Sequence, residues 1–228
     1  IMANATPALT AAVSATKDIP ILGTSITAYG VALDLADFDG TVGGNVSGTS
    51  DLADLSAQAA MITEWFPETK KVGLLFCSAE PNSRYQIEEV AKYLADKGIE
   101  SKEFAFTDTN DVTAVTQAAA DYADVIYIPT DNTAAANTEA IANVLIPAKV
   151  PAICGEEGIC SGCGVATLSI SYYDLGVTTG KMAAKILTGE ADISTMAIEY
   201  TNATKKYNAA TCDALGIKPL DGYTAIGE

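Results

Sequence analysis

Polar side chains follow three short apolar runs at the point where each run ends. The runs are VGLLF (72–76), VIYIP (125–129) and VPAIC (150–154), and the loops after them begin SAEPNS, TDN and GEE. A strand buried on both faces of a parallel sheet is a continuous apolar run, and ligands bind at the carboxyl ends of such strands. If the three strands are neighbours, one wall of a ligand cleft is formed by Ser78, Glu80, Asn82, Ser83, Thr130, Asp131, Asn132 and Glu156.

Composition excludes several kinds of chemistry. Histidine is absent, which removes the usual general base of hydrolases and the commonest metal ligand. The adjacent pair Glu156 and Glu157 is a poor acid/base couple, because neighbours on one loop seldom reach the same substrate atom. A net charge of -16 and a single arginine, Arg84, argue against nucleic-acid partners. We therefore expect no catalytic residues, cofactor or metal.

Five cysteines leave more than one interpretation open. Cys160 and Cys163 form a Cys-x-x-Cys pair, which is typical of a redox pair, half of a zinc site or a local disulfide. A zinc site would need Cys154 and one more sulfur or a carboxylate, since no histidine is available. Buried free thiols or a local disulfide need no such ligands, and one of these is the main expectation.

The elements that position these loops alternate regularly between helix and strand. Crossover helices of this kind must cover a sheet face, so the pattern predicts an α/β fold with a parallel, doubly wound sheet. Residues 1–5 are expected to be the end of a strand. The expected helices span 8–16, 52–66, 82–97, 111–122, 133–146, 175–187 and 209–215, and the further expected strands span 19–24, 71–76, 100–106, 124–129, 150–154, 165–170, 196–201 and 206–208. Residues 155–164 are expected to form a loop.

The order of several motifs resembles one known family. These motifs are ATPAL, IPILGTSIT, GGNVSGTSDL, LLFCSAEPNS, YIPTDNT, PAICGEE and SISYYDLGVTTGKMAAKILTGE, and they extend over nearly the whole chain. Together they resemble the solute-binding proteins of ABC transporters whose members bind tryptophan, phenylalanine or tyrosine. The resemblance implies the type I periplasmic-binding fold, with two Rossmann-like lobes that close on a ligand.

Carried onto this sequence, the resemblance places residues 1–50 and 172–198 in the first lobe. The second lobe would comprise residues 51–171 and 199–228. Family members carry further strands and helices before ATPAL, so the first lobe is expected to be incomplete in this chain, with an exposed sheet edge. We therefore expect a fragment of a longer protein.

An amino-acid ligand needs acceptors for its ammonium group and donors for its carboxylate. Asp131 is the first candidate for the ammonium group and Glu156 the second. Asn132 and Thr130 are candidates to donate to the carboxylate. Ser78, Ser83 and the backbone amides at the start of the helix at Asn82 would assist them, since the helix dipole favours an anion there. The opposing wall would be supplied by Thr6, Ser50 and Asp51. Of Tyr172 and Tyr173, one would stack on an aromatic ligand and the other would pack in the core.

Each of these residues also has a structural interpretation. Asp131 and Asn132 are good caps for a helix at Thr133, Asn82 and Ser83 for the helix that follows them, and Thr6, Ser50 and Asp51 for theirs. Arg84 is expected to pair with Glu80 or Glu88. Trp65, before Pro67, is expected to pack in the core.

The sequence thus predicts the solute receptor of an ABC importer that captures a small, aromatic amino acid and delivers it to a membrane permease. Such a protein would be extracellular or periplasmic and anchored as a lipoprotein. The alternatives are the same fold with a sugar or nucleoside as cargo, an enzyme, or a regulatory domain attached to a further module.

Overall fold

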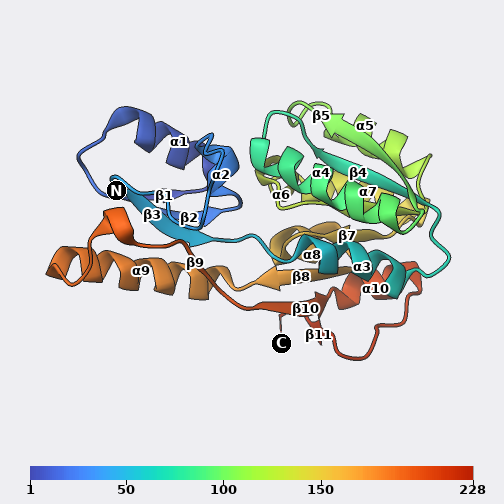
Figure 1. The fold of residues 1–228 in the computed structure, drawn as a ribbon. Helices are drawn as coiled ribbons and strands as arrows, with labels where there is room; N and C mark the ends of the chain where they lie inside the picture. The colour runs from blue at the N-terminus through green and yellow to red at the C-terminus, as the bar shows by residue number, and fades with distance from the viewer. Residues whose placement is uncertain (228) are drawn as a thin grey trace. The chain divides into compact units, whose positions relative to one another are not determined.

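The computed structural model describes residues 1–227, which divide into two compact units. Unit 1 comprises residues 1–52 and 170–202, and unit 2 comprises the described residues from 53–169 and from 203 onward. Figure 1 shows the elements of each unit, and strands and helices alternate in both.

Unit 1 contains a sheet of four strands among its described residues, in the order β1-β2-β3-β9, and every pairing is parallel. Its elements are β1 (Met2–Asn4), α1 (Thr6–Ala15), β2 (Ile21–Ile26), α2 (Tyr29–Ala32), β3 (Val46–Ser50), α9 (Tyr172–Thr188), a 3₁₀ turn (Ile193–Thr195) and β9 (Glu199–Tyr200).

Two glycines in unit 1 make room for a tyrosine. A side chain on Gly23 or Gly48 would lie 2.3 or 2.4 Å from the Tyr29 hydroxyl, and Gly48 has a φ of +145° that other residues rarely adopt. The hydroxyl donates to the Thr49 carbonyl at 3.1 Å, so the buried phenol is satisfied. The close approach of β2, β3 and α2 therefore depends on these glycines.

Unit 2 contains a sheet whose described strands follow the order β11-β10-β8-β7-β6-β4-β5. Its strands are β4 (Lys71–Cys77), β5 (Glu100–Phe106), β6 (Val125–Ile128), β7 (Ala152–Cys154), β8 (Ala166–Ile170), β10 (Ala203–Tyr207) and β11 (Thr224–Ala225). Its helices are α3 (Leu55–Trp65), α4 (Pro81–Asp96), α5 (Val112–Ala120), α6 (Asn132–Ala135), α7 (Thr138–Ala148), α8 (Glu157–Cys163) and α10 (Ala209–Leu215).

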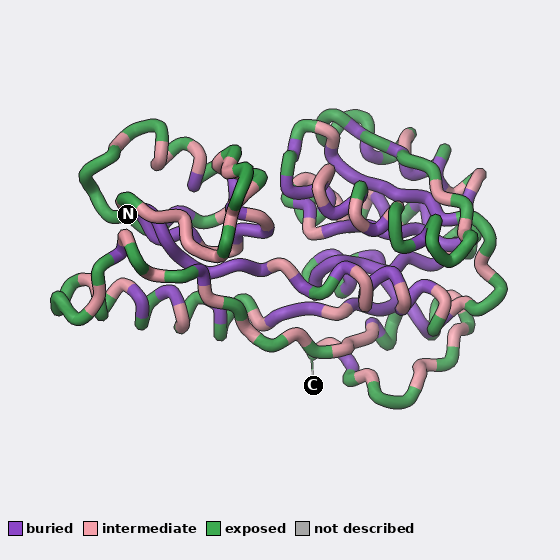
Figure 2. Tube along the Cα trace, viewed as in Figure 1, coloured by how far each residue is buried: buried purple, intermediate pink, exposed green. Residues whose placement is uncertain are grey.

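The core of unit 2 runs along its central strands (Figure 2). After its first residue β4 is buried throughout, whereas β5, at the edge, buries only Phe104 and Phe106. A central strand between two helix layers needs apolar residues on both faces, and an edge strand does not. The continuous apolar runs in the sequence therefore identified the central strands correctly.

Several expected elements differ from the structure. The helix expected over 133–146 is two helices, α6 and α7, because the Asn137 side chain donates to the Thr133 carbonyl at 2.7 Å and replaces a backbone bond there. Residues 157–163 form α8 instead of part of a loop. The short helix α2 and the strand β11 were not expected from the sequence.

Candidate functional site

The three apolar runs are neighbouring strands, which is the condition under which their polar loops meet. β7 pairs with β6 and β6 pairs with β4, all in parallel, so their carboxyl ends meet at one edge of the sheet in unit 2. The loops SAEPNS, TDN and GEE therefore leave the same edge. We call the side chains of these loops, with the starts of α4 and α6, the unit 2 cluster.

Glu80 is the most heavily hydrogen-bonded residue of the unit 2 cluster. Its Oε2 accepts from the Asn132 backbone N–H at 3.0 Å and from the Asn132 amide at 2.7 Å. Its Oε1 accepts from the Thr133 N–H at 2.9 Å and from the Thr133 hydroxyl at 2.8 Å. Burial opposes ionisation, yet these donors lower the pKa of Glu80 below its ordinary value.

Asp131 is buried and both of its oxygens accept bonds from backbone groups. Oδ1 accepts from the Ala134 N–H and Oδ2 from the Cys77 N–H, each at 2.7 Å. The helix-capping role that the sequence left open is therefore present. Burial and the nearby Glu80 carboxylate raise the pKa of Asp131, against hydrogen bonds from Ala134, Cys77 and Ser83. Its role toward a ligand stays a prediction.

Asn82 lies at the centre of the unit 2 cluster with an unsatisfied oxygen. Its amide Nδ2 donates to the Thr130 carbonyl at 3.2 Å and to Glu80 Oε2 at 3.3 Å. Its Oδ1 is buried and has no hydrogen-bond partner among the described residues. Asn82 and Ser83 were candidate caps, but this was wrong: α4 starts at Pro81 after Glu80, whose side chain is used by α6 instead.

Glu156 caps α8 at the third strand end. Its two carboxylate oxygens accept from the backbone N–H groups of Gly158 and Ile159. Gly155, just before it, approaches Thr130 so closely that a side chain would lie 2.6 Å from the Thr130 nitrogen. A glycine is therefore required where the second and third loops meet.

Three other predicted residues of unit 2 have structural roles. The Ser78 hydroxyl donates to the Phe106 carbonyl at 3.2 Å, which ties the first loop to the end of β5. Arg84 pairs with Glu103 at 3.5 Å, not with Glu80 or Glu88 as expected, since the Glu80 carboxylate is occupied by α6. Trp65 is buried, as expected, and packs edge-on against Tyr223 with ring centroids 5.0 Å apart.

A second group of predicted residues lies at the carboxyl edge of unit 1. Ser50 donates to the Thr27 carbonyl at 3.0 Å, and the Tyr172 hydroxyl donates to Asp51 Oδ2 at 3.2 Å. The helix after β3 is capped by Asp54, which accepts from the N–H groups of Ser56 and Ala57. Ser50 and Asp51 are therefore not caps, which corrects one of the two interpretations of these residues.

Thr6 is not a cap either, since it is the first residue of α1. The residue before it, Ala5, has a φ of +70° and offers no capping side chain. Ser25, at the same edge in β2, has a φ of +55°. Such conformations are uncommon for residues other than glycine and concentrate at functional sites.

All five cysteines are buried free thiols. Burial and the neighbouring Cys160 and Cys163 raise the pKa of Cys154 well above its ordinary value, and burial raises the pKa of Cys212 to about 11. Within residues 1–227 no group of three or more His, Cys, Asp or Glu side chains is arranged to bind a metal. No helix in this part of the chain is long and apolar enough to cross a bilayer.

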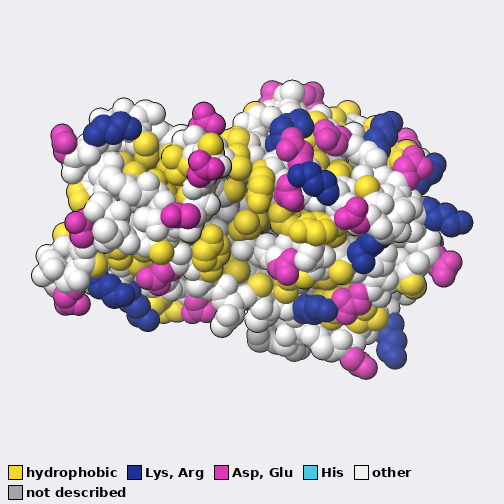
Figure 3. All heavy atoms as spheres, in the orientation of Figure 1, with side chains coloured by type: hydrophobic (Ala, Val, Ile, Leu, Met, Phe, Trp, Pro, Cys, Tyr) yellow, Lys and Arg dark blue, Asp and Glu magenta, His cyan; other side chains and the backbone are white. Residues whose placement is uncertain are grey.

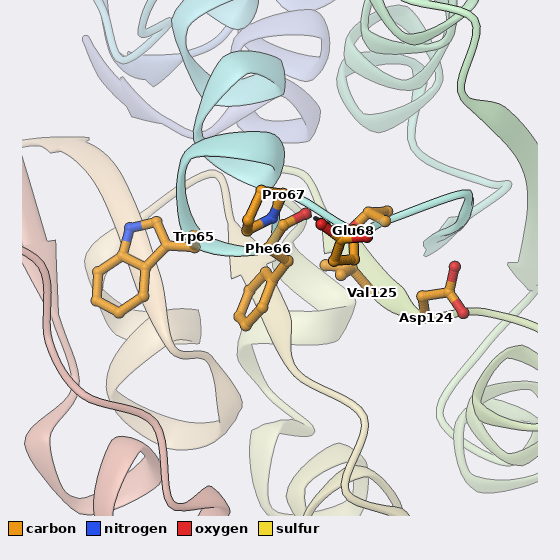
Figure 4. Close-up of a pocket in the computed structure, with 7 residues that line it drawn as sticks. Trp65, Phe66, Pro67, Glu68, Asp124 and Val125 are labelled. Carbon is orange, nitrogen blue, oxygen red and sulfur yellow. Dashed lines mark hydrogen bonds between the residues drawn. The ribbon is translucent and has the colours of Figure 1, made fainter.

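A cavity of about 400 Å³ lies at the opposite edge of the unit 2 sheet (Figure 4). It is lined by the end of α3 and the residues after it, including Phe66 and Pro67, and by Asp124 and Val125 at the start of β6. Asp124 accepts from the N–H groups of Lys70 and Lys71 at 2.9 Å, so it fastens the start of β4. Figure 3 shows acidic side chains spread over the visible face.

The sequence analysis missed two buried glutamines that support the unit 2 cluster. Gln86 donates to the Thr130 carbonyl and accepts from the Thr130 N–H, both at 3.0 Å. Gln58 donates to the Gly155 and Leu168 carbonyls and accepts from Tyr127. Gln58 lies on the otherwise apolar buried face of α3, and Gln86 lies on the buried face of α4 together with Ile87 and Val90. A polar residue at a core position was the signal that could have identified them.

Two parallel sheets with polar side chains at their carboxyl edges define a ligand-binding protein with the type I periplasmic-binding fold. Residues 1–220 match the family described as ABC transporter substrate binding protein, and the chain belongs to that family. Its members are substrate-binding proteins and not enzymes, as the sequence predicted.

Individual relatives agree with this assignment. The chain is 32% identical over 222 residues to a tyrosine-binding protein of Clostridioides difficile (strain R20291), covering 96% of this chain and 64% of that protein. An ABC domain from Streptococcus pneumoniae, solved in complex with L-Trp, has a TM-score of 0.91 at 30% identity, covering 99% of this chain and 80% of that one. A conserved domain protein from Vibrio cholerae has the same TM-score and identity, covering 98% and 77%.

Proposed function

We propose that this protein is the solute receptor of an ABC importer and that it binds a free amino acid with an aromatic side chain. The observation that carries the proposal is that the carboxyl edge of each sheet offers a buried oxygen without a hydrogen-bond partner. These oxygens are Asn82 Oδ1 in unit 2 and Asp51 Oδ1 in unit 1. Acceptors without donors suit a ligand that brings its own N–H groups.

The carboxylate of the ligand requires donors, which both edges supply. The backbone N–H of Thr6 lies at the start of α1, where no side chain caps the helix. The dipole of this ten-residue helix favours an anion there. In unit 2 the exposed Asn132 amide and the half-buried Thr130 hydroxyl are the accessible donors. Ser83 and Glu156 would shape the cluster, and Ser78 would border it.

The aromatic preference rests on Tyr172 and on the relatives. Tyr172 is 38% exposed and begins α9 at the edge that carries Asp51. A phenol placed in this way can stack on an aromatic ring while its hydroxyl stays hydrogen-bonded. The tyrosine-binding and L-Trp-bound relatives support the same class of ligand.

The sequence-based lobes, residues 1–50 with 172–198 and residues 51–171 with 199–228, are carried forward in this proposal. A ligand that contacts residues of both lobes favours the arrangement in which all contacts form together. The protein would act outside the cytoplasmic membrane, anchored as a lipoprotein, and would deliver its ligand to the permease of the transporter.

A thermal-shift screen tests the proposal. The panel contains the twenty amino acids with several sugars and nucleosides, each at a concentration about 1,000-fold above a micromolar Kd. Such a ligand stabilises the folded state by about 4 kcal/mol, which corresponds to a rise in Tm of roughly 10 °C for a chain of this size. Tm shifts limited to Tyr, Trp and Phe would support the proposal. A Tm shift with a sugar and with no amino acid would refute the proposal that the ligand is an amino acid.

A further inference from the structure

Asp51 is a buried carboxylate whose charge is not neutralised by the protein. It follows β3 directly, is 5% exposed, and its Oδ1 has no hydrogen-bond partner among the described residues. Its Oδ2 accepts from the Tyr172 hydroxyl at 3.2 Å, which is a long bond from a neutral donor. A carboxylate that is withdrawn from water needs a cation or a proton.

The side chains that face Asp51 carry no positive charge. They are Tyr29 from α2, Tyr172 from α9 and Thr27, which follows β2. None of the four ion pairs found within residues 1–227 involves Asp51. Two phenols and a hydroxyl therefore face a group that would be better satisfied by an ammonium.

The other candidate carboxylates are already satisfied by the protein. Asp131 accepts two backbone N–H groups at 2.7 Å, Glu80 accepts four bonds from Asn132 and Thr133, and Glu156 caps α8. Each of these groups gains its hydrogen bonds without a ligand. Among the predicted site carboxylates, Asp51 is the one that retains a free oxygen.

We propose that Asp51 binds the ammonium group of the amino-acid ligand, and that it gives up a proton when the ligand binds. The inference rests on the proposed function and assigns a role within the same site. Burial raises the pKa of Asp51, and the hydrogen bonds from Thr27 and Tyr172 offset only part of this rise. A ligand cation lowers it again, so affinity rises with pH above the ordinary carboxyl pKa of about 3.9.

A thermodynamic cycle between protein and ligand tests the assignment. Wild type and the Asp51→Asn variant are titrated with L-tyrosine and with its deaminated analogue 3-(4-hydroxyphenyl)propanoate. The same titrations use L-tryptophan and indole-3-propanoate. The substitution should weaken binding of the amino acids by at least ~30-fold and change that of the analogues by less than ~3-fold, because only the former lose a charge pair.

Two further variants make the comparison specific. Asp37→Asn removes the same charge from an exposed position in unit 1 and should leave all four affinities unchanged. Asp131→Asn is the competing assignment. Near-UV circular dichroism of each ligand-free variant tests whether the fold is retained. We expect Asp51→Asn to keep the fold, because the Asn amide has the size of a protonated Asp carboxyl group.

Proton release provides an independent readout. Calorimetric titrations in buffers of different ionisation enthalpy give the number of protons exchanged at each pH. Wild type should release protons on binding amino acid at mildly acidic pH, and Asp51→Asn should release fewer.

If Asp51→Asn lowers the affinity for the amino acid and for its analogue by the same factor, the proposal is overturned. It is also overturned if Asp131→Asn, and not Asp51→Asn, selectively weakens binding of the amino acid. In either case amino-acid binding by the wild type would leave the proposed function standing. A wild type that binds none of the amino acids would refute the proposed function and the role of Asp51 together.

Discussion

Replacing Glu80 by alanine should loosen the unit 2 cluster, because one carboxylate orders the whole start of α6. Glu80 is 8% exposed and accepts from both the backbone N–H and the side chain of Asn132 and of Thr133. In the alanine variant these donors lose their acceptor within the protein. The loop that carries the TDN motif would then be ordered mainly by Asp131.

The size of the effect follows from the two backbone bonds. A hydrogen bond to a charged group contributes about 1.5–3 kcal/mol, and the exposed Asn132 side chain can regain its bond from water. We therefore expect a loss of roughly 3–4 kcal/mol in the free energy of unfolding. Glu80→Gln keeps the shape but loses the charge, and should cost about half as much.

The single tryptophan makes the measurement specific to unit 2. Trp65 is buried at the end of α3, so its fluorescence during urea unfolding reports on the unit that contains Glu80. Glu103→Ala is the control, because its ion pair with Arg84 is about half exposed and should contribute less than ~1 kcal/mol. A loss of less than ~1 kcal/mol for Glu80→Ala would refute the view that this carboxylate orders α6.

Three further outcomes are expected. Gly48→Ala should destabilise unit 1 by several kcal/mol, because the new methyl group would lie 2.1 Å from the Gly23 carbonyl oxygen. Gly180→Ala, on α9 with no atom near the new methyl group, should stabilise the protein by roughly 0.5–1 kcal/mol. Thermal unfolding measures both changes. A thiol reagent should label none of the five cysteines in the folded protein and all five in denaturant. The folded pKa of Glu80 is lowered, so its contribution to stability should be lost as the pH falls below the ordinary Glu value of about 4.3, and Glu80→Gln should flatten this acid limb of the unfolding curve. The folded pKa of Asp131 is raised, so the cost of its ionised form should be relieved as the pH falls through that raised pKa towards the ordinary Asp value of about 3.9. Asp131→Asn removes this relief and should steepen the loss of stability in that pH range.

The apolar runs of the sequence predicted the central strands of unit 2 because a buried parallel strand needs apolar residues on both faces. The same reasoning placed the polar loops together at one edge, since parallel neighbours end on the same side. Short elements escaped prediction. α8 has two glycines and two cysteines in seven residues and depends on Glu156, Ser169 and Asn208 for its position.

Capping was the least predictable feature, because the residue types that cap helices also bind ligands. Asp131 does cap a helix, whereas Thr6, Ser50 and Asp51 do not. Nothing in residue type separates these cases. Where a helix starts depends on the tertiary position of the backbone N–H groups, which local sequence does not determine.

The segment Asp51-Leu52-Ala53-Asp54 shows how the two roles can be separated once the helix start is known. Asp54 accepts from the first N–H groups of α3, so the helix has no further use for Asp51. The peptide N–H of Asp51 is itself bonded to the Ile26 carbonyl, which fixes the residue at the strand end. A carboxylate that is fixed in place, buried and not needed by any helix start costs stability at neutral pH. An ammonium group supplied by the ligand would offset that cost, so Asp51→Asn should make the ligand-free protein more stable while weakening its hold on an amino acid.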